Sequence, residues 1–136
     1  MDKEPRIRIY KVTWEELTSR LETLAKQLPQ DATIFGILRG GHIIAGMLSF
    51  IRPDLKLRLA PLAATWTIDD IADTGATLAK HRLPNNKFLT VFRRWSCSEK
   101  VDLVSYQLPQ VQEDLWIQFP YDNPDYDKPG TRQSGA

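Results

Sequence analysis

Acidic and hydroxyl side chains are concentrated in the segment Thr67–Leu78, which reads TIDDIADTGATL. Asp69 and Asp70 end an apolar run, and Asp73 opens a glycine turn that leads into a helical pattern. The start of a helix offers free backbone N–H groups to a phosphate, and the hydroxyls of the Thr74–Thr77 turn add donors. Two adjacent carboxylates beside such a turn suit a sugar diol or Mg2+. The segment therefore predicts a sugar-phosphate site.

An acidic turn is also a common way to begin a helix, with Asp73 or Thr74 as the N-cap, and spacing alone leaves both interpretations open. A second glycine turn, Gly36–Gly41 (GILRGG), follows another apolar run. Its glycines permit a ligand to approach the backbone closely, and Arg39 can chelate a phosphate. Two turns suited to anions favour a binding site over a purely structural acidic turn.

Alternating strand and helix patterns surround these turns. The strand candidates are Arg6–Val12, Thr33–Leu38, Leu55–Leu59, Thr65–Ile68, Lys87–Phe92, Asp102–Tyr106 and Trp116–Phe119. The helix candidates are Thr13–Leu28, His42–Ile51 and Thr74–Leu83. This alternation predicts an α/β fold with a mainly parallel sheet, and ligands of such sheets collect beyond the carboxyl ends of the strands, where both turns fall.

The helix from Thr13 to Leu28 carries the clearest pattern. Its apolar residues recur three and four positions apart, which places them on one stripe. Thr13 as N-cap and Glu16 three residues later predict a capping box. Within this helix and the later strand Thr65–Ile68, Trp14 and Trp66 are expected to pack in the core.

Composition indicates one ordinary domain, because 136 residues with 42% hydrophobic content and a net charge of +1 supply a core but no broad positive field. Nucleic acid is therefore not an expected partner. The single cysteine, Cys97, cannot form an internal disulfide, and no signal peptide or membrane span is visible, which predicts a cytoplasmic protein. Residues 1–121 are expected to form the domain and 122–136 a flexible tail. His42 and His81 lack the spacing of metal ligands.

The segment Thr67–Thr77 resembles the signature of the type I phosphoribosyltransferases, in which two hydrophobic residues and two acids precede two variable residues and D-T-G-x-T. Thr67 departs from it slightly. Within that family, Leu38–Gly41 is similar to the pyrophosphate loop of bacterial xanthine-guanine enzymes, and Asp114–Asp122 to their purine-contacting segment. The resemblance covers Val12 to Asp122.

This resemblance implies a mainly parallel sheet flanked by helices and transfer of phosphoribosyl from phosphoribosyl pyrophosphate to a 6-oxopurine (guanine, xanthine or hypoxanthine), with Mg2+. It implies that Asp73 is the general acid or base near purine N7. The implied phosphoribosyl contacts are Asp69, Asp70, Thr74, Gly75, Ala76 and Thr77, of which Asp69 and Asp70 also organise the metal. The implied pyrophosphate contacts are Leu38, Arg39, Gly40 and Gly41, in the family often with a non-proline cis peptide. The implied purine contacts are Arg94, Trp116, Ile117 and Asp122.

Two departures from the family bear on activity. Arg94 stands where the family usually has the lysine that contacts the purine 6-oxygen, although Arg93–Arg94 also fits a solvated pair of cations. Only Arg52–Ile68 connects the second helix to the acidic motif, where relatives have a long loop that closes over the sugar. The sequence therefore leaves open a slow or hydrolytic enzyme and a catalytically impaired binding protein that senses nucleotide or phosphoribosyl pyrophosphate. Relatives build their sites near subunit contacts, which predicts a homo-oligomer.

Overall fold

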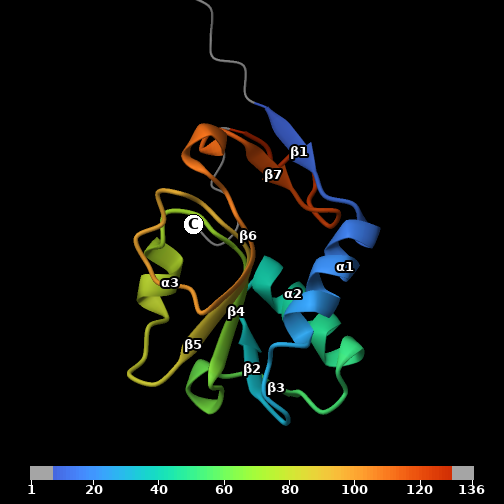
Figure 1. The fold of residues 1–136 in the computed structure, drawn as a ribbon, viewed down its shortest axis with the longest axis vertical. Coiled ribbons are helices and arrows are strands. Elements are labelled where there is room, and N and C mark those ends of the chain that lie inside the picture. The colour runs from blue at the N-terminus through green and yellow to red at the C-terminus, as the bar shows by residue number, and fades with distance from the viewer. Residues whose placement is uncertain (1–7, 130–136) are drawn as a thin grey trace, which may run out of the picture.

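Five parallel strands form the central sheet in a computed structural model that describes residues 8–129. Their spatial order is β3-β2-β4-β5-β6 (Figure 1). They are β2 (Thr33–Gly36), β3 (Lys56–Arg58), β4 (Trp66–Ala72), β5 (Lys87–Arg93) and β6 (Leu103–Gln107). Every neighbouring pair is parallel, so the carboxyl ends of all five strands lie at one edge. The predicted α/β fold is confirmed.

The central strand β4 is longer than its sequence pattern predicts. It continues through Asp69 and Asp70 to Ala72, and each of its residues is buried. The extension has ladder partners on β5, where Ile71 pairs with Phe92 and Ala72 with Arg93. The two aspartates therefore lie inside a fully covered strand instead of at its exposed end.

A second, two-stranded sheet lies beyond the carboxyl ends of the main sheet (Figure 1). It consists of β1 (Ile9–Lys11) and β7 (Trp116–Gln118), which run parallel with Ile9 opposite Trp116. We call this unit the hood. The strand predicted at Arg6–Val12 is thus present from Ile9, but it pairs only within the hood; residues 6 and 7 lie outside the described part of the chain.

Three helices cover the main sheet. α1 (Trp14–Ala25) and α2 (Gly40–Ile51) lie on one face and α3 (Ala76–Lys80) on the other (Figure 1). The larger apolar core lies on the side of α1 and α2, and a smaller cluster that includes Leu78, Phe88 and Cys97 lies under α3. Within residues 8–129, none of the helices has the length and apolar character needed to cross a membrane.

The start of α1 confirms half of the predicted capping box. The Thr13 hydroxyl accepts a hydrogen bond from Glu16 N at 3.0 Å. The Glu16 carboxylate does not return to the cap; it accepts from Tyr10 Oη at 2.6 Å and from Arg20 Nε at 2.9 Å. This carboxylate therefore joins α1 to the hood. The prediction that Trp14 packs in the core is wrong, because this residue is 51% exposed.

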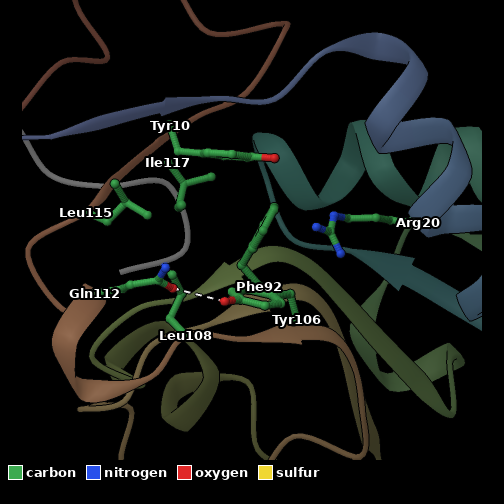
Figure 2. Close-up of a pocket in the computed structure, with 8 residues that line it drawn as sticks. All are labelled: Tyr10, Arg20, Phe92, Tyr106, Leu108, Gln112, Leu115 and Ile117. Atoms are coloured by element: carbon green, nitrogen blue, oxygen red, sulfur yellow. Dashed lines mark hydrogen bonds between the residues drawn. The ribbon is translucent and has the colours of Figure 1, made fainter.

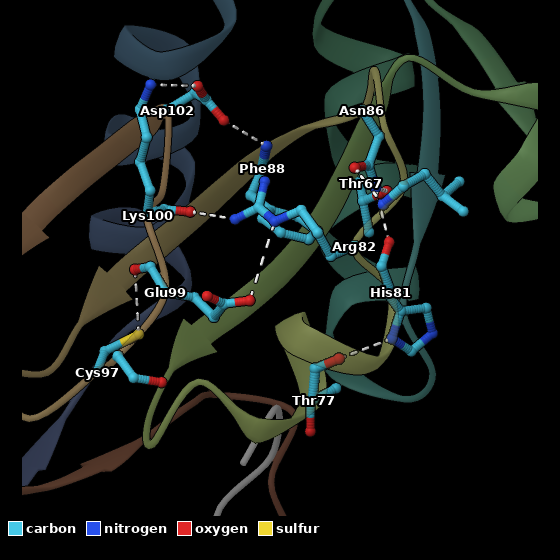
Figure 3. Close-up of polar contacts among 12 residues, drawn as sticks. Thr67, Thr77, His81, Arg82, Asn86, Phe88, Cys97, Glu99, Lys100 and Asp102 are labelled. Atoms are coloured by element: carbon cyan, nitrogen blue, oxygen red, sulfur yellow. Dashed lines mark hydrogen bonds and ion pairs between the residues drawn. The ribbon is translucent and has the colours of Figure 1, made fainter.

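Polar side chains fix the turn between α3 and β5 (Figure 3). The Asn86 amide donates to His81 O at 2.8 Å and to Thr67 Oγ1 at 3.2 Å, and its carbonyl accepts from Leu83 N. His81 Nδ1 lies 2.9 Å from Thr77 O. α3 is shorter than the predicted helix Thr74–Leu83, and His81 is its C-cap residue.

The connection between β3 and β4 leaves β3 after Arg58, which is level with Phe35 of β2 and therefore with Thr67 near the beginning of β4, and it lies away from the hood (Figure 1). It contains a short 3-10 helix, Pro61–Ala63. Thr65 N donates to the hydroxyl of Thr33, the first residue of β2, at 2.9 Å. Residues 62–65 also line one shallow cavity with residues 83–86, which precede β5. Residues 62–65 of this connection therefore lie near the beginnings of β2, β4 and β5.

Residues 122–129, assigned from sequence to a tail, lie against the carboxyl edge of the domain. Tyr126 N and Asp127 N donate to Asn123 O at 3.0 and 2.7 Å, which closes a turn. Asp127 then forms an ion pair with Arg39 at 2.9 Å. The domain boundary at residue 121 stays a prediction, and residues 130–136 lie outside the described part of the chain.

Candidate functional site

The site lies at the carboxyl ends of β2 and β4, where the connections leave the sheet in opposite directions. Such a switch point creates a crevice for ligands. The Leu38–Gly41 loop after β2 reaches β4 at Gly41, where an added Cβ would come within 2.9 Å of Asp69 Cα. Glycine is needed for this approach, so the loop directly adjoins the first acid. The Leu38–Arg39 peptide bond is cis, as the family resemblance implies.

Asp69 is a buried carboxylate with one unsatisfied oxygen. Its Oδ1 accepts from Asp70 N at 2.9 Å, whereas its Oδ2 has no hydrogen-bond partner among the described residues. Burial, followed by the negative charge of Asp70, raises the pKa of Asp69 well above its ordinary value. A buried polar atom without a partner costs on the order of 1 to 3 kcal/mol, which is typical of a position that serves a ligand.

Asp70 is held by Tyr121, which comes from the segment after the hood. Asp70 Oδ1 accepts from Ile71 N at 2.8 Å, and Oδ2 accepts from Tyr121 Oη at 2.7 Å. Burial and then the Asp70 charge raise the pKa of Tyr121, so the phenol remains a neutral donor. The Tyr121 ring stacks on Phe119 with centroids 5.4 Å apart. These contacts fix the orientation of the second acid.

Asp73 forms an ion pair with the buried guanidinium of Arg94. Arg94 Nε lies 2.6 Å from Asp73 Oδ1, and Nη1 donates to Glu113 O at 3.1 Å and Leu115 O at 2.7 Å. Arg94 thus connects the acidic turn to the segment that enters β7. The alternative of a solvated Arg93–Arg94 pair is wrong, because Arg94 is only 6% exposed and Arg93 donates to backbone carbonyls.

The Thr74–Thr77 turn continues from Asp73 and begins α3. Gly75 is the N-cap with a φ of 96°, a left-handed conformation that favours glycine. The Thr74 hydroxyl accepts from Ala76 N at 3.2 Å, and Thr74 O accepts from Ser98 N at 3.0 Å. Thr74 and Ala76 are exposed, so the turn faces solvent beside the acids.

Arg39 and Asp122 meet at a small cavity of about 120 Å3 beside the Leu38–Gly41 loop. Arg39 Nη2 donates to Asp127 Oδ1 at 2.9 Å, and Asp127 Oδ2 accepts from Asn123 N. Asp122 Oδ2 accepts from Phe119 N at 2.8 Å. Burial, helped by the nearby charges of Asp70 and Asp127, raises the pKa of Asp122 to about 6 although the Phe119 N–H opposes this. The expected purine contact Asp122 therefore lies next to the loop.

The hood strand β7 presents Trp116 and Ile117 to different surroundings. Trp116 is buried, and its Nε1 has no hydrogen-bond partner among the described residues. Ile117 packs in the main core and lines a cavity with Phe92. Since neighbouring strand residues point to opposite faces, Trp116 faces away from that core.

The cavity that Ile117 lines has a volume of about 240 Å3 and lies between the hood, α1 and strands β5 and β6 (Figure 2). Its polar side chains are satisfied within the protein: Tyr10 Oη and Arg20 Nε donate to Glu16, and Tyr106 Oη donates to Gln112 Oε1 at 3.1 Å. These contacts occupy the two tyrosine hydroxyls and Arg20 Nε within the protein, so we do not assign a ligand to this cavity.

The acids fit a cation that is held largely by substrate oxygens. Mg2+ is usually bound by one or two carboxylates together with substrate phosphates and water. Asp69 Oδ2 is an unpartnered oxygen of that kind, whereas both Asp70 oxygens accept hydrogen bonds. Over residues 8–129, no group of three or more His, Cys, Asp or Glu side chains is placed to hold a metal ion. The protein alone therefore offers an incomplete shell.

The structure brings most of the predicted site residues to one edge of the sheet, and it adds two that sequence reasoning missed. Tyr121 lies in the segment Asp114–Asp122, for which the resemblance implies no role at this position, and Asp127 lies in the predicted tail. Neither shows a local signal, since each acts through a partner far along the chain. The roles of Arg94, Trp116 and Ile117 toward a purine stay predictions.

Comparison with known proteins identifies similar sequences. The chain is 32% identical over 143 residues to the xanthine-guanine phosphoribosyltransferase of Idiomarina loihiensis, covering 82% of this chain and 85% of the relative. It is 29% identical to the enzyme of the same name from Chromohalobacter salexigens, with 83% of each chain covered. The chain matches no family model.

Solved structures share the fold. A purine phosphoribosyltransferase from Pyrococcus horikoshii superposes with a TM-score of 0.66 at 23% identity, over 85% of this chain and 95% of that one. A xanthine-guanine-hypoxanthine phosphoribosyltransferase from Helicobacter pylori gives a TM-score of 0.61 at 18% identity, over 82% and 92%.

Proposed function

The chain belongs to the xanthine-guanine phosphoribosyltransferase family, a group of glycosyltransferases, and from that premise we propose that it transfers phosphoribosyl from phosphoribosyl pyrophosphate to a 6-oxopurine. Guanine, xanthine and hypoxanthine are the candidate acceptors. The observation that carries the proposal is the approach of Gly41 to Asp69, which puts an exposed arginine loop beside a buried acid with an unpartnered oxygen. Pyrophosphate and ribose would occupy these two positions.

In the proposed reaction, the bond between ribose C1 and the pyrophosphate oxygen breaks and a bond from a purine nitrogen to C1 forms. Positive charge develops on the ribose ring, so carboxylates beside it stabilise the transition state. Asp69 and Asp70 would hold the ribose hydroxyls, with Tyr121 keeping Asp70 in place. Asp73 would take the proton that the purine loses. Arg39 would stabilise the departing pyrophosphate.

A bound Mg2+ would neutralise charge on the pyrophosphate, and we assign Asp69 Oδ2 to it because this carboxylate oxygen has no hydrogen-bond partner among the described residues. The 5′-phosphate would lie on the Thr74–Thr77 turn, where Gly75 allows the backbone to bend and two hydroxyls are at hand. Trp116 would stack on the purine, with Ile117 backbone groups and Asp122 at its edge.

The connection between β3 and β4 supports slow transfer. Residues 62–65 lie near the amino ends of β2 and β5, and we infer that so short a connection does not close over the ribose. Water excluded by a closing loop in other enzymes would reach the ribose carbon here. We expect hydrolysis to ribose 5-phosphate to accompany nucleotide formation.

Self-association is also part of the proposal. Phe50, Leu59 and Leu62 are 89%, 85% and 83% exposed, and self-association would remove such apolar side chains from water. We expect a homo-oligomer, measured by light scattering during gel filtration. A protein that elutes as a monomer at micromolar concentration would contradict the proposed self-association.

The direct test of the substrate class is an assay of nucleotide formation with phosphoribosyl pyrophosphate, Mg2+ and each of guanine, xanthine, hypoxanthine and adenine. We expect the three 6-oxopurines to react and adenine to react least, because two relatives, at 32% and 29% identity, are named for xanthine and guanine, which both carry a 6-oxygen. Equal rates with adenine would contradict the 6-oxopurine assignment. No nucleotide from any base would contradict the proposed activity itself.

A further inference from the structure

The Arg94 guanidinium makes more contacts within the protein than a side chain that only binds a purine base would need. Its guanidinium is buried, its Nε lies 2.6 Å from Asp73 Oδ1, and its Nη1 donates to two backbone carbonyls. The carbonyls belong to Glu113 and Leu115, immediately before hood strand β7. One side chain thus joins the acidic turn at the end of β4 to the hood.

Such a contact suits arginine in particular. A guanidinium presents several donors in a rigid plane and can bind a carboxylate and carbonyls at the same time, whereas a lysine has one nitrogen. The arrangement is also costly to break, since removing one partner of a buried pair leaves an uncompensated charge. Arg94 therefore sets the distance between Asp73 and the strand that carries Trp116.

We propose that Arg94 is a positioning residue, which orients the Asp73 carboxylate and fixes the hood over it, and that its effect on the reaction passes through Asp73. This inference rests on the proposed function. It differs from the role that the family resemblance implies, in which the side chain at this position contacts the purine directly. A positioning role predicts a loss of kcat that is equal for all bases. A reading role predicts a loss of selectivity.

The experiment is a double-mutant cycle on nucleotide formation with Arg94→Gln, Asp73→Asn and the double variant. Loss of a positioned acid or base lowers rates by about 100-fold or more, so Asp73→Asn is expected to lower kcat by about that factor. Arg94→Gln is expected to lower kcat at least about tenfold with unchanged preference among guanine, hypoxanthine and adenine. In the Asp73→Asn background, adding Arg94→Gln is expected to change kcat by less than about threefold.

Two further variants complete the test. Arg94→Lys keeps the positive charge but loses the planar guanidinium and its several donors. We expect its kcat to lie between those of the wild type and Arg94→Gln. Arg93→Lys is the matched control, because Arg93 donates to Cys97 O and Glu99 O outside the site; we expect wild-type kcat and selectivity.

The outcomes separate the two roles even where Arg94→Gln alone does not fold, because the double variant removes both charges of the buried pair. A lower preference for guanine over adenine, in the double variant relative to Asp73→Asn, would overturn the inference. So would rate losses that simply multiply in the cycle. Failure of the proposed function would show itself separately, as a wild-type protein that forms no nucleotide.

Discussion

Replacing Asp69 with asparagine is expected to stabilise the free protein and to weaken its binding of phosphoribosyl pyrophosphate. Asparagine keeps the Oδ1 acceptor that Asp70 N uses, and it replaces the unpartnered Oδ2 with an N–H2 group next to the Asp70 carboxylate. The substitution removes a buried charge whose pKa is raised by burial and by Asp70. A buried polar atom that gains a partner is worth on the order of 1 to 3 kcal/mol.

That free energy predicts a higher Tm, by about 4 °C per kcal/mol for a chain of this size. The direction of the Asp69 pKa shift also determines how the stability of the protein depends on pH. Because the folded pKa of Asp69 is raised, protonation favours the folded state, and this stability is lost as pH rises through the folded pKa. The advantage of Asp69→Asn is therefore expected to grow with pH and to vanish near pH 4, at the ordinary aspartate pKa.

Thermal unfolding between pH 4 and 8, with and without ligand, measures both effects. Asp102→Asn is the matched control, since Asp102 is a partly buried carboxylate that accepts from Phe88 N away from the site (Figure 3). We expect it to lower the Tm slightly and to leave the shift caused by phosphoribosyl pyrophosphate and Mg2+ unchanged. An Asp69→Asn protein that is less stable than wild type at pH 8, or that keeps the full ligand-induced shift, would refute the reasoning.

Three other substitutions have defined expectations. Asp122→Asn is expected to raise the Tm at pH 8 but not at pH 4, because burial raises the folded pKa of Asp122 to about 6 and protonation below that value favours the folded state; a pH-independent effect would argue against it. Asp127 and a bound pyrophosphate would compete for Arg39, so Asp127→Asn is expected to lower the Kd for phosphoribosyl pyrophosphate. The expected decrease is up to about fivefold, which corresponds to the free energy of an exposed ion pair. Weaker binding of phosphoribosyl pyrophosphate in calorimetry would contradict this competition. Trp116→Ala is expected to weaken purine binding by on the order of 1 to 3 kcal/mol if the ring stacks on the base, with Mg2+-dependent phosphoribosyl pyrophosphate binding as the control; full purine affinity would mean that Trp116 only packs.

Local sequence patterns predicted the elements of the main sheet and its helices. The helix beginning at Trp14 follows from its apolar stripe and its cap, and the parallel sheet follows from the alternation of elements. Both ligand-suited turns fall at carboxyl ends, as the fold class requires. The exposure of Trp14 did not follow, because a residue in the first turn can extend beyond the surface that the rest of the stripe buries.

Contacts that join distant parts of the chain were beyond sequence reasoning. In the hood, β1 pairs with β7, which lies near the other end of the domain sequence. The sequence of neither strand indicates which strand it pairs with. Tyr121 and Asp70 are 51 residues apart, and Arg39 and Asp127 are 88 apart. Periodicity reports which face a residue occupies, not which residue meets it. The geometry of the site therefore depends on tertiary contacts more than its motifs suggest.

Calorimetric titration of the wild-type protein with phosphoribosyl pyrophosphate, with and without Mg2+, tests most directly whether this edge of the sheet is the phosphoribosyl site. We expect heat of binding that strengthens with Mg2+, and a stabilisation of about 2.7 kcal/mol at one hundred times the Kd. A protein that shows neither heat nor a shift in Tm at millimolar ligand, with Mg2+ present, would contradict the account.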